Sequence, residues 1–283
     1  MDSGDTLQRF IFEHAEIRGE IARLDDTYQT IIAQRDYPPA VRKLLGEALV
    51  SCLLLVGSIK FEGELSLQFQ GDEALPMMII QCDHQLHLRG FARFQAGLKD
   101  EDYQNAFLHG QMTFLINQSH LTEIYQSIIP IHSTDMSQNL MSFFSQSEQV
   151  ATQISIASNE QQVVGMLLQL LPGQDTEQRE EFWSYASKIG QTVTSEELLS
   201  LPNEAILHRL YHETDIRLLI EKEARFQCRC HMEKMKSLLK SFGEKEVREL
   251  LDETGQIDIT CDFCNQHYLF DAIDVEMLFR GIS

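Results

Sequence analysis

Basic side chains are scarce in this sequence of 283 residues. Lysine and arginine together number 23, against 43 aspartates and glutamates, and the formal net charge is −20 at pH 7. Proteins that bind nucleic acids neutralise phosphates with lysine and arginine. No run of basic residues in this sequence could form such a face. The composition therefore argues against a nucleic-acid partner.

Long hydrophobic runs are also missing. The longest apolar run, from Ala48 to Val56, contains a serine and is far shorter than the roughly 20 residues that cross a bilayer. The N-terminus from Met1 to Thr6 is acidic, and no apolar stretch follows it that could act as a signal peptide. We therefore expect a cytoplasmic protein with no membrane partner.

The common nucleotide-binding and hydrolase motifs are absent as well. The sequence has no Gly-x-x-x-x-Gly-Lys-Ser/Thr phosphate loop, no His-Glu-x-x-His and no Gly-x-Ser-x-Gly. Without the phosphate loop, the sequence shows no motif that would bind ATP. Without the other two motifs, a hydrolytic enzyme is disfavoured. We therefore do not expect an enzyme.

The composition that is present is that of a folded protein. Hydrophobic residues make up 43% and charged residues 23%, which is ordinary for globular chains. The length fits one large domain or two unequal ones. Charge density rises after the chain breakers Leu171-Pro172-Gly173. We predict an N-terminal core domain over residues 1–175, a helical linker over 176–225 and a small C-terminal domain over 226–283.

Residues 1–175 mix helical and extended patterns. After Pro38-Pro39, apolar residues recur three and four positions apart from Ala40 to Ile59, which predicts a helix with a buried face. Glu64 to Gln70 alternates and stops at Gly71-Asp72, which predicts a strand and a turn. The fold class we expect is α+β, with a mixed α/β core. Its other expected elements are strands at Met77–Cys82, His84–Arg89, Gly110–Ile116 and Thr152–Ala157, and helices at Met136–Ser147 and Glu160–Leu171.

The middle segment is helical by pattern. Charged and apolar residues separate onto two faces from Thr176 to Lys188, Thr194 and Glu197 form a capping box, and a third helix starts near Pro202. Two interpretations stay open: surface helices packed on the core, or a linker held only weakly in place.

Cysteines are the feature most informative about chemistry. Four of the six, Cys228, Cys230, Cys261 and Cys264, gather near the C-terminus. Clustered cysteines in a cytosolic protein are more often metal ligands or redox sites than permanent disulfides. The other two, Cys52 and Cys82, sit inside apolar stretches, where buried inert thiols are expected.

The spacing of the four clustered cysteines predicts a metal site. Cys228-x-Cys230 follows an extended stretch, and Cys261-x-x-Cys264 separates two expected strands, so the second pair lies on a hairpin knuckle. Two short helices are expected in between, His231–Phe242 and Glu244–Thr254. Two close pairs of thiolates on turns, joined by a compact insert, form a tetrahedral Zn²⁺ site.

Alternatives to that site remain open at this point. A thioredoxin-type motif needs its first cysteine at a helix N-terminus, and an iron–sulfur cluster usually shows other spacings. His231 or His267 could replace one sulfur as a ligand. Whether the site is only structural is also open, but a Cys228–Cys230 disulfide closes a small strained ring that is easily reduced, which favours a reversible sensor.

The small size of the C-terminal segment, residues 226–283, also favours a reversible sensor. A segment of about 58 residues buries little surface and is marginal alone, whereas structural zinc supplies about 10–16 kcal/mol of folding free energy. Oxidation of the thiolates is therefore expected to unfold the small domain.

Together these residues resemble the 33 kDa chaperonin family along nearly the whole chain. The resemblance rests on the two cysteine pairs and on Gly255-Gln-Ile-Asp-Ile-Thr before the second pair. It rests also on Arg18-Gly-Glu, Tyr37-Pro-Pro-Ala-Val-Arg, Leu65 to Gly71, His84-Gln-Leu-His-Leu-Arg and Tyr125-Gln-Ser-Ile-Ile-Pro. The sequence differs after Cys230, where the family commonly has serine and this chain has His231.

The resemblance implies a redox-regulated, ATP-independent holdase of the bacterial cytosol. It implies that the reduced, inactive form holds one Zn²⁺ through Cys228, Cys230, Cys261 and Cys264. Oxidation is then expected to form the Cys228–Cys230 and Cys261–Cys264 disulfides, to release zinc and to unfold the C-terminal domain and linker. The active form, often a homodimer, binds unfolded client proteins.

Two other functions are weighed against this one. An interaction or nucleic-acid module with a purely structural zinc site is disfavoured because residues 226–283 are net acidic. A thiol oxidoreductase using Cys261 and Cys264 would need a metal-free site that turns over.

Overall fold

The computed structural model describes residues 4–118, 120, 124–173 and 176–280. It divides the chain into two compact units, Met1–Phe226 and Gln227–Ser283. Each unit has its own hydrophobic core. Among the described residues, no helix is both long and apolar enough to cross a membrane.

The first unit is built on two antiparallel sheets. Sheet A has the strand order β10-β1-β2-β9-β8, with β11 paired to the edge of β1. Sheet B has the order β12-β5-β4-β3-β6-β7, and β12 joins it in parallel. The strands of sheet A are β1 Thr6–Phe12, β2 Ile17–Leu24, β8 Thr152–Ser158, β9 Val163–Leu170, β10 Ile216–Leu218 and β11 Lys222–Glu223. Those of sheet B are β3 Gly63–Gln70, β4 Met77–Asp83, β5 His87–Arg93, β6 Gln111–Gln118, β7 Tyr125–Ile129 and β12 Arg225–Phe226.

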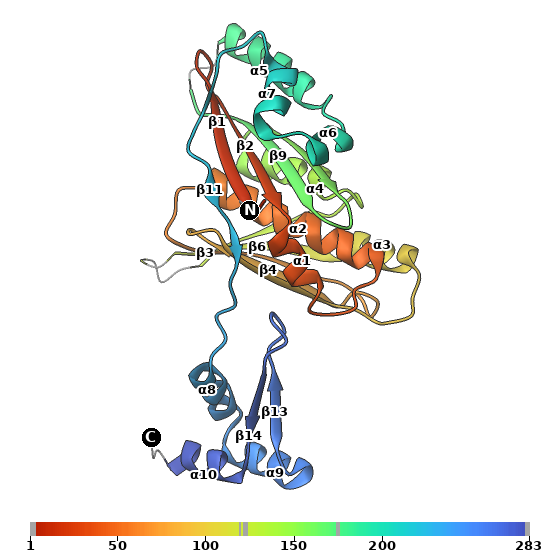
Figure 1. The fold of residues 1–283 in the computed structure, drawn as a ribbon, viewed down its shortest axis with the longest axis vertical. Helices are drawn as coiled ribbons and strands as arrows, with labels where there is room; N and C mark the ends of the chain where they lie inside the picture. The colour runs from red at the N-terminus through yellow and green to blue at the C-terminus, as the bar shows by residue number, and fades with distance from the viewer. Residues whose placement is uncertain (1–3, 119, 121–123, 174–175, 281–283) are drawn as a thin grey trace. The chain divides into compact units, whose positions relative to one another are not determined.

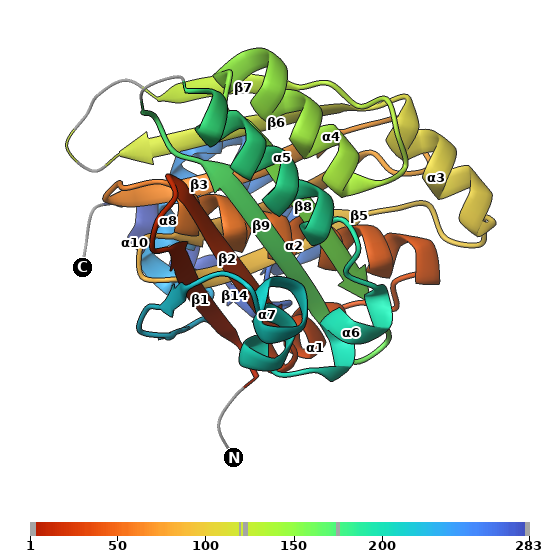
Figure 2. The ribbon, with the colours of Figure 1, turned by 90° about the horizontal axis from the view of Figure 1, so that it is seen from above.

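Helix α2, Pro39–Ser58, lies between the two sheets and contacts strands of both. Figure 2 looks onto sheet A from the side of α5–α7 and shows α2 behind it. Every residue from Leu44 to Ser58 is buried, as expected for a helix covered on all sides. The remaining elements of the core are α1 Asp26–Ile32, α3 Asp100–Leu108, α4 Met136–Phe143 and the π-turn η1 Phe144–Glu148. The α+β class expected from the sequence is confirmed.

The middle segment packs on the outer face of sheet A. Its helices are α5 Glu177–Gly190, α6 Ser195–Ser200 and α7 Asn203–Tyr211, and Figure 1 shows them beside β1, β2 and β9. A second core joins this face of the sheet to the helices, with buried residues Phe10, Phe12, Ile17, Ile21, Ala157, Val164, Met166, Leu168, Ala186, Leu198, Ile206, Leu207 and Tyr211. Thr194 and Glu197 form the capping box that the sequence predicts. In this structure, then, the middle helices are packed on the core.

One predicted helix is wrong. Most of residues 160–171 lie in strand β9, Val163–Leu170, which pairs with β2 on one side and β8 on the other. Residues Val163–Gln169 are all buried, so the strand is a continuous apolar run with no period of two. Periodicity alone does not separate such a strand from a buried helix.

The predicted strand at His84–Arg89 is displaced. The chain turns at Leu86, whose φ is 65°, while Asp83 Oδ1 accepts the N–H groups of Gln85 and His87. Strand β5 therefore begins at His87 and continues to Arg93. Strands β1 and β2 were not assigned from the sequence.

The second unit contains three helices and one hairpin. These are α8 Met232–Phe242, α9 Glu244–Thr254, β13 Ile257–Thr260, β14 His267–Phe270 and α10 Ala272–Arg280. Gly243 and Gly255, at φ 92° and 74°, end α8 and α9 in backbone conformations that favour glycine. The unit's core is small, with eight buried apolar residues: Met235, Leu239, Val247, Leu251, Ile257, Phe270, Val275 and Leu278.

We predict that Tyr211→Phe loosens the packing of α5 against α7. The Tyr211 hydroxyl is buried and donates a 2.9 Å hydrogen bond to the Ala186 carbonyl, so its loss costs about 1 kcal/mol of unfolding free energy. Urea unfolding measures this loss. Tyr185→Phe is the matched control, because that hydroxyl makes no hydrogen bond to any residue that the structure describes. Equal stability of the two variants would contradict the prediction.

Candidate metal centre

Local structure brings each cysteine pair to a turn. Cys228 and Cys230 lie between β12 and α8, and Cys261 and Cys264 lie in the turn joining β13 to β14. Cys261 N–H donates to the Gln266 carbonyl at 2.9 Å, and Asn265 N–H donates to the Cys261 carbonyl at 2.9 Å. Asn265 adopts φ 56°, in the left-handed region that asparagine tolerates better than most residues. These bonds close the hairpin knuckle that the sequence predicts.

The hairpin is fixed by burial of its ends. Ile257 on β13 is paired with Phe270 on β14, and both are buried against the helices of the unit. Because side chains alternate along a strand, this pair sets the register of the whole hairpin. The register places the knuckle at the end away from Ile257, where its two sulfurs meet those of Cys228 and Cys230.

The four sulfur atoms form one compact group. All lie within 4.8 Å of one another. Cys228 Sγ is 3.4 Å from Cys230 Sγ and 3.7 Å from Cys261 Sγ, and Cys230 Sγ is 3.2 Å from Cys264 Sγ. In a tetrahedron with metal–sulfur bonds of about 2.3 Å, the sulfurs are about 3.8 Å apart. The donor set and its spacing therefore fit a four-thiolate metal site.

The environment of the sulfur group makes Cys264 a weaker acid than an ordinary cysteine. Burial raises the pKa of Cys264 well above its ordinary value, and the thiols of Cys230, Cys228 and Cys261 raise it further. The Gln266 N–H opposes this by donating to the Cys264 sulfur. A metal ion reverses the balance, because a coordinating thiol is deprotonated outright. Metal binding at this site must therefore release protons.

Neither neighbouring histidine belongs to the sulfur group. His231 caps α8, and its Nδ1 accepts the Lys234 N–H at 3.3 Å. His267 Nδ1 lies 2.9 Å from Asp258 Oδ2, in an ion pair on the hairpin. Within the part of the chain that the structure describes, the four cysteines are the one group of three or more ligating side chains close enough to share an ion.

The arrangement does not match a thioredoxin-type motif. Cys261 follows strand β13 and lies in a turn, and the next element is strand β14 rather than a helix. A helix N-terminus, which lowers the pKa of the attacking thiol in such motifs, is missing at this position.

Sequence reasoning missed Tyr268. Its hydroxyl hydrogen-bonds the Cys230 side chain, and this contact raises the pKa of Tyr268. The alternation of β14 gives a weak signal for this, since buried Phe270 lies two positions along the strand and puts Tyr268 on the same face.

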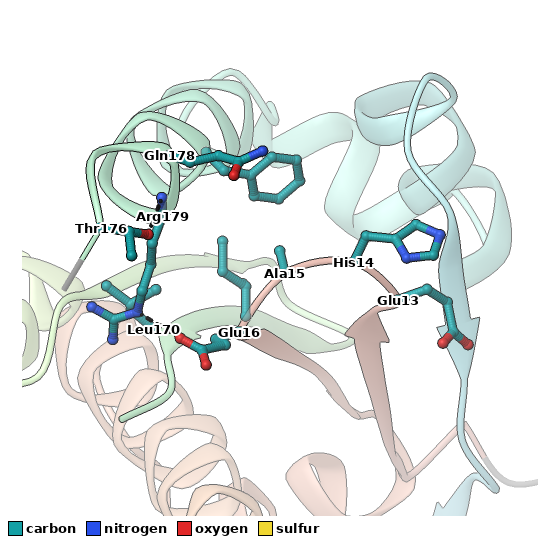
Figure 3. A pocket seen from close by; sticks show the side chains of 10 residues that line it. Glu13, His14, Ala15, Glu16, Leu170, Thr176, Gln178 and Arg179 are labelled. Carbon is teal, nitrogen blue, oxygen red and sulfur yellow. Dashed lines mark hydrogen bonds and ion pairs between the residues drawn. The ribbon is translucent and has the colours of Figure 1, made fainter. Parts of the chain in front are cut away.

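The larger cavities lie elsewhere, in the first unit. One of about 570 Å³ opens between the β1–β2 turn and the start of α5 (Figure 3). Arg179 Nε pairs with Glu16 at 2.9 Å there, and a second nitrogen of Arg179 donates to the Leu171 carbonyl at 2.5 Å. This ion pair links α5 to the β1–β2 turn. The cavity therefore lies where the middle segment packs against the core.

The fold and the site together define a two-unit protein whose smaller unit carries a four-cysteine cluster that fits a metal site. A family model described as Hsp33 protein matches residues 5–271. The 33 kDa chaperonin of Pseudomonas savastanoi is 37% identical, with 98% of this chain and 94% of that protein covered. The chain belongs to this family of chaperones, named Hsp33 or 33 kDa chaperonin.

Other relatives support the same family assignment. The 33 kDa chaperonin of Shewanella loihica is 37% identical over 99% of this chain and 97% of its own length. The crystal structure of the 33 kDa chaperonin of Thermotoga maritima is 20% identical, covers 98% of both chains and superposes with a TM-score of 0.83. That structure shares the fold of this chain.

We predict that Cys264→Ser lowers the affinity of the reduced protein for Zn²⁺ by more than about 100-fold. Changes to residues that only support a ligand cost about 10- to 100-fold, and a serine hydroxyl is a poor ligand at neutral pH. Competition with a chromophoric chelator measures the affinity. Cys82→Ala, which removes a thiol of the first unit, serves as the control and keeps wild-type affinity.

Proposed function

We propose that this protein is a redox-regulated, ATP-independent holdase that holds one Zn²⁺ when reduced and becomes active when oxidised. The observation that carries the proposal is the convergence of four thiols inside a unit with only eight buried apolar residues. A unit of that size depends on its cross-link more than on its core.

The four thiolates are the zinc ligands in this proposal. Soft sulfur donors in a tetrahedral set favour Zn²⁺ over the hard cations that prefer oxygen. When bound, zinc neutralises the crowded thiolates and ties the Cys228–Cys230 loop to the β13–β14 turn. A closed four-ligand site leaves no open position for substrate, which agrees with a structural role in the reduced state.

The small unit has little else to keep it folded. Its surface leaves many large apolar side chains exposed: Met232, Leu238, Phe242, Leu250, Leu269, Ile273 and Met277. The apolar area that these residues leave in water contributes nothing to folding. Loss of the cross-link is therefore expected to unfold this unit.

Oxidation removes the ligands in pairs. Two thiols lose two electrons and two protons in forming one S–S bond, and one peroxide is reduced to two waters. We propose Cys228 with Cys230 and Cys261 with Cys264, the pairs that are neighbours in sequence. The sulfur distances do not choose this pairing, because Cys230 and Cys264 are the closest measured pair at 3.2 Å. Sequence proximity favours it, since neighbours remain close after the unit unfolds.

The middle segment is the proposed second part of the switch. Helices α5–α7 cover an apolar face of sheet A that includes Phe12, Ile17, Met166 and Leu168. Residues 215–226 join these helices to the first cysteine loop, and Leu219 and Ile220 are exposed along the way. When the helices leave, the sheet presents a contiguous apolar patch of the kind that binds other proteins.

The proposed clients are unfolded or partly unfolded proteins, held in the cytoplasm, and the proposed active form is a homodimer. Apolar patches of this kind bind without sequence preference, as a holdase requires. A net charge of −20 keeps such a surface soluble through self-repulsion.

We predict that peroxide at raised temperature releases zinc and makes the protein suppress client aggregation. A chelating dye follows the zinc, and light scattering follows an aggregating client. Reduced protein is the first control and remains inactive. Cys82→Ala is the second and behaves as wild type. Zinc release without suppression would refute the holdase and leave a purely structural zinc site.

We predict that Asn203→Ala lowers the temperature at which the oxidised protein becomes active. Asn203 Oδ1 accepts the Arg23 Nε–H at 2.7 Å and its Nδ2 donates to Gln8 Oε1 at 3.0 Å, which ties the start of α7 to β1 and β2. Loss of both bonds costs about 1–3 kcal/mol.

Glu204→Gln, next to it and exposed, is the matched control. An Asn203→Ala variant that is less stable in urea but activates at the wild-type temperature would show that undocking of α7 is not the activating step.

A further inference from the structure

Four cationic side chains from four separate segments meet around one cavity of the first unit. The cavity, of about 310 Å³, is lined by Arg9 of β1, Arg18 of β2, Lys60 after α2 and Lys222 of β11. We call it the cationic pocket. Its wall includes Val56 and Phe61, and no acidic residue lines it. In a chain of net charge −20, this local excess of positive charge is unusual.

The two arginines are held in place by helix α2. Arg9 donates to the Gly57 carbonyl, and Arg18 donates to the Ser58 carbonyl at 2.5 Å and to the Gln169 side chain. Carbonyls at a helix C-terminus lack intrahelical partners and carry partial negative charge, so they attract guanidinium groups. The arginines are thereby fixed side by side before any ligand arrives.

Two buried guanidinium nitrogens in this group make no hydrogen bond. Arg9 Nε and Arg18 Nε both lack an acceptor among the described residues, and both carboxylate oxygens of Glu20 lack a donor. A buried donor left without an acceptor is destabilising. An anion within reach of Arg18 Nε would supply such an acceptor.

The carboxylate of Glu20 only partly neutralises the positive charge of Arg9 and Arg18. Its carboxylate is 1% exposed and lies 3.3 Å from Arg9 Nε. Burial raises the pKa of Glu20 to about 8, although Arg9 and Arg18 oppose this shift. Gly57 is required here, because a Cβ at that position would lie 2.1 Å from Glu20 Oε2. At neutral pH the pair of guanidiniums therefore keeps a net positive charge.

The two lysines add positive charge to the lining of the pocket. Lys60 and Lys222 are exposed, and neither makes an ion pair within the described ranges. Like charges gathered around one cavity raise each other's energy, and a bound anion relieves that repulsion. Guanidinium groups match the oxygens of a phosphate, while lysines contribute mobile point charges.

We propose that the cationic pocket binds a small anion carrying a phosphate group, with Arg18 and the two lysines as its principal contacts. The volume is at the lower end of the range for small-molecule sites, which fits inorganic phosphates or one small phosphate ester. The apolar wall at Val56 and Phe61 gives an ester an additional contact that an inorganic ion does not use.

The position of Lys222 links this pocket to regulation, an extension that rests on the proposed function. Lys222 lies on β11, opposite Leu7 of β1, in the segment that follows the middle helices (Figure 1). An anion held by Lys222 and by Arg18 fastens this segment to the core. A ligand that binds only the docked form stabilises it by mass action and opposes activation.

Calorimetric titration of the reduced full-length protein with inorganic pyrophosphate tests the site. We expect saturable one-site binding that weakens as salt rises, and a Kd at least about tenfold higher in Lys60→Gln/Lys222→Gln, because that variant loses two charged contacts to the anion. Lys188→Gln/Lys240→Gln, with the same charge change on two exposed lysines elsewhere, keeps wild-type affinity. Absence of binding at millimolar pyrophosphate, or equal loss in both double variants, would overturn the proposal.

Parallel titrations with phosphate and ADP identify the source of the phosphate group. Tighter binding of ADP than of pyrophosphate assigns the site to an ester that uses the apolar wall, and the reverse order assigns it to an inorganic anion. These titrations need neither oxidant nor client, so they are independent of the proposed function. If pyrophosphate binds but leaves the onset of activity after peroxide unchanged, the regulatory extension is wrong and the site stands.

Discussion

Four thiols must share a space about as wide as one metal ion, and the state of the small unit depends on how that crowding is resolved. All four sulfurs lie within 4.8 Å of one another, and burial raises the pKa of Cys264. In the proposed function, a divalent cation binds the four sulfurs as thiolates, whereas disulfides need no cation and no fixed hairpin. One sulfur cannot take part in both arrangements, and a redox switch needs two states that exclude each other.

In the proposed function, one surface of the first unit also has two uses. It binds the middle helices in one state and client proteins in the other. The outer face of sheet A is apolar, and the middle helices cover it with a modest set of side chains and a few polar ties. Arg23 to Asn203, Arg179 to Glu16 and Tyr211 to Ala186 are such ties, each made by a side chain at or near the end of a segment. In the proposed function, loss of these contacts lets the segment leave while the sheets beneath it stay folded.

Prediction from sequence succeeded where the signal is local. The cysteine pairs are two and three residues apart and lie on turns that glycine and alternating strands mark, so the clustering of their four sulfurs could be predicted without the fold. The helix predicted at 160–171 failed because a strand buried on both faces has no polar alternation. Tyr268 was missed because its role depends on the hairpin register, which is set by Ile257 and Phe270 at the opposite end.

The net charge gives a second example of a feature that sequence alone does not reveal, because it depends on residues that are distant in sequence. A value of −20, with no run of basic residues, argues against an extended basic face. It does not exclude a pocket, since Arg9, Arg18, Lys60 and Lys222 are scattered over more than 200 positions and meet only when β1, β2, the end of α2 and β11 come together. The acidity of the remaining surface then works in the pocket's favour. If the pocket binds an anion as proposed, the pairing of β11 with β1 is what brings Lys222 to it.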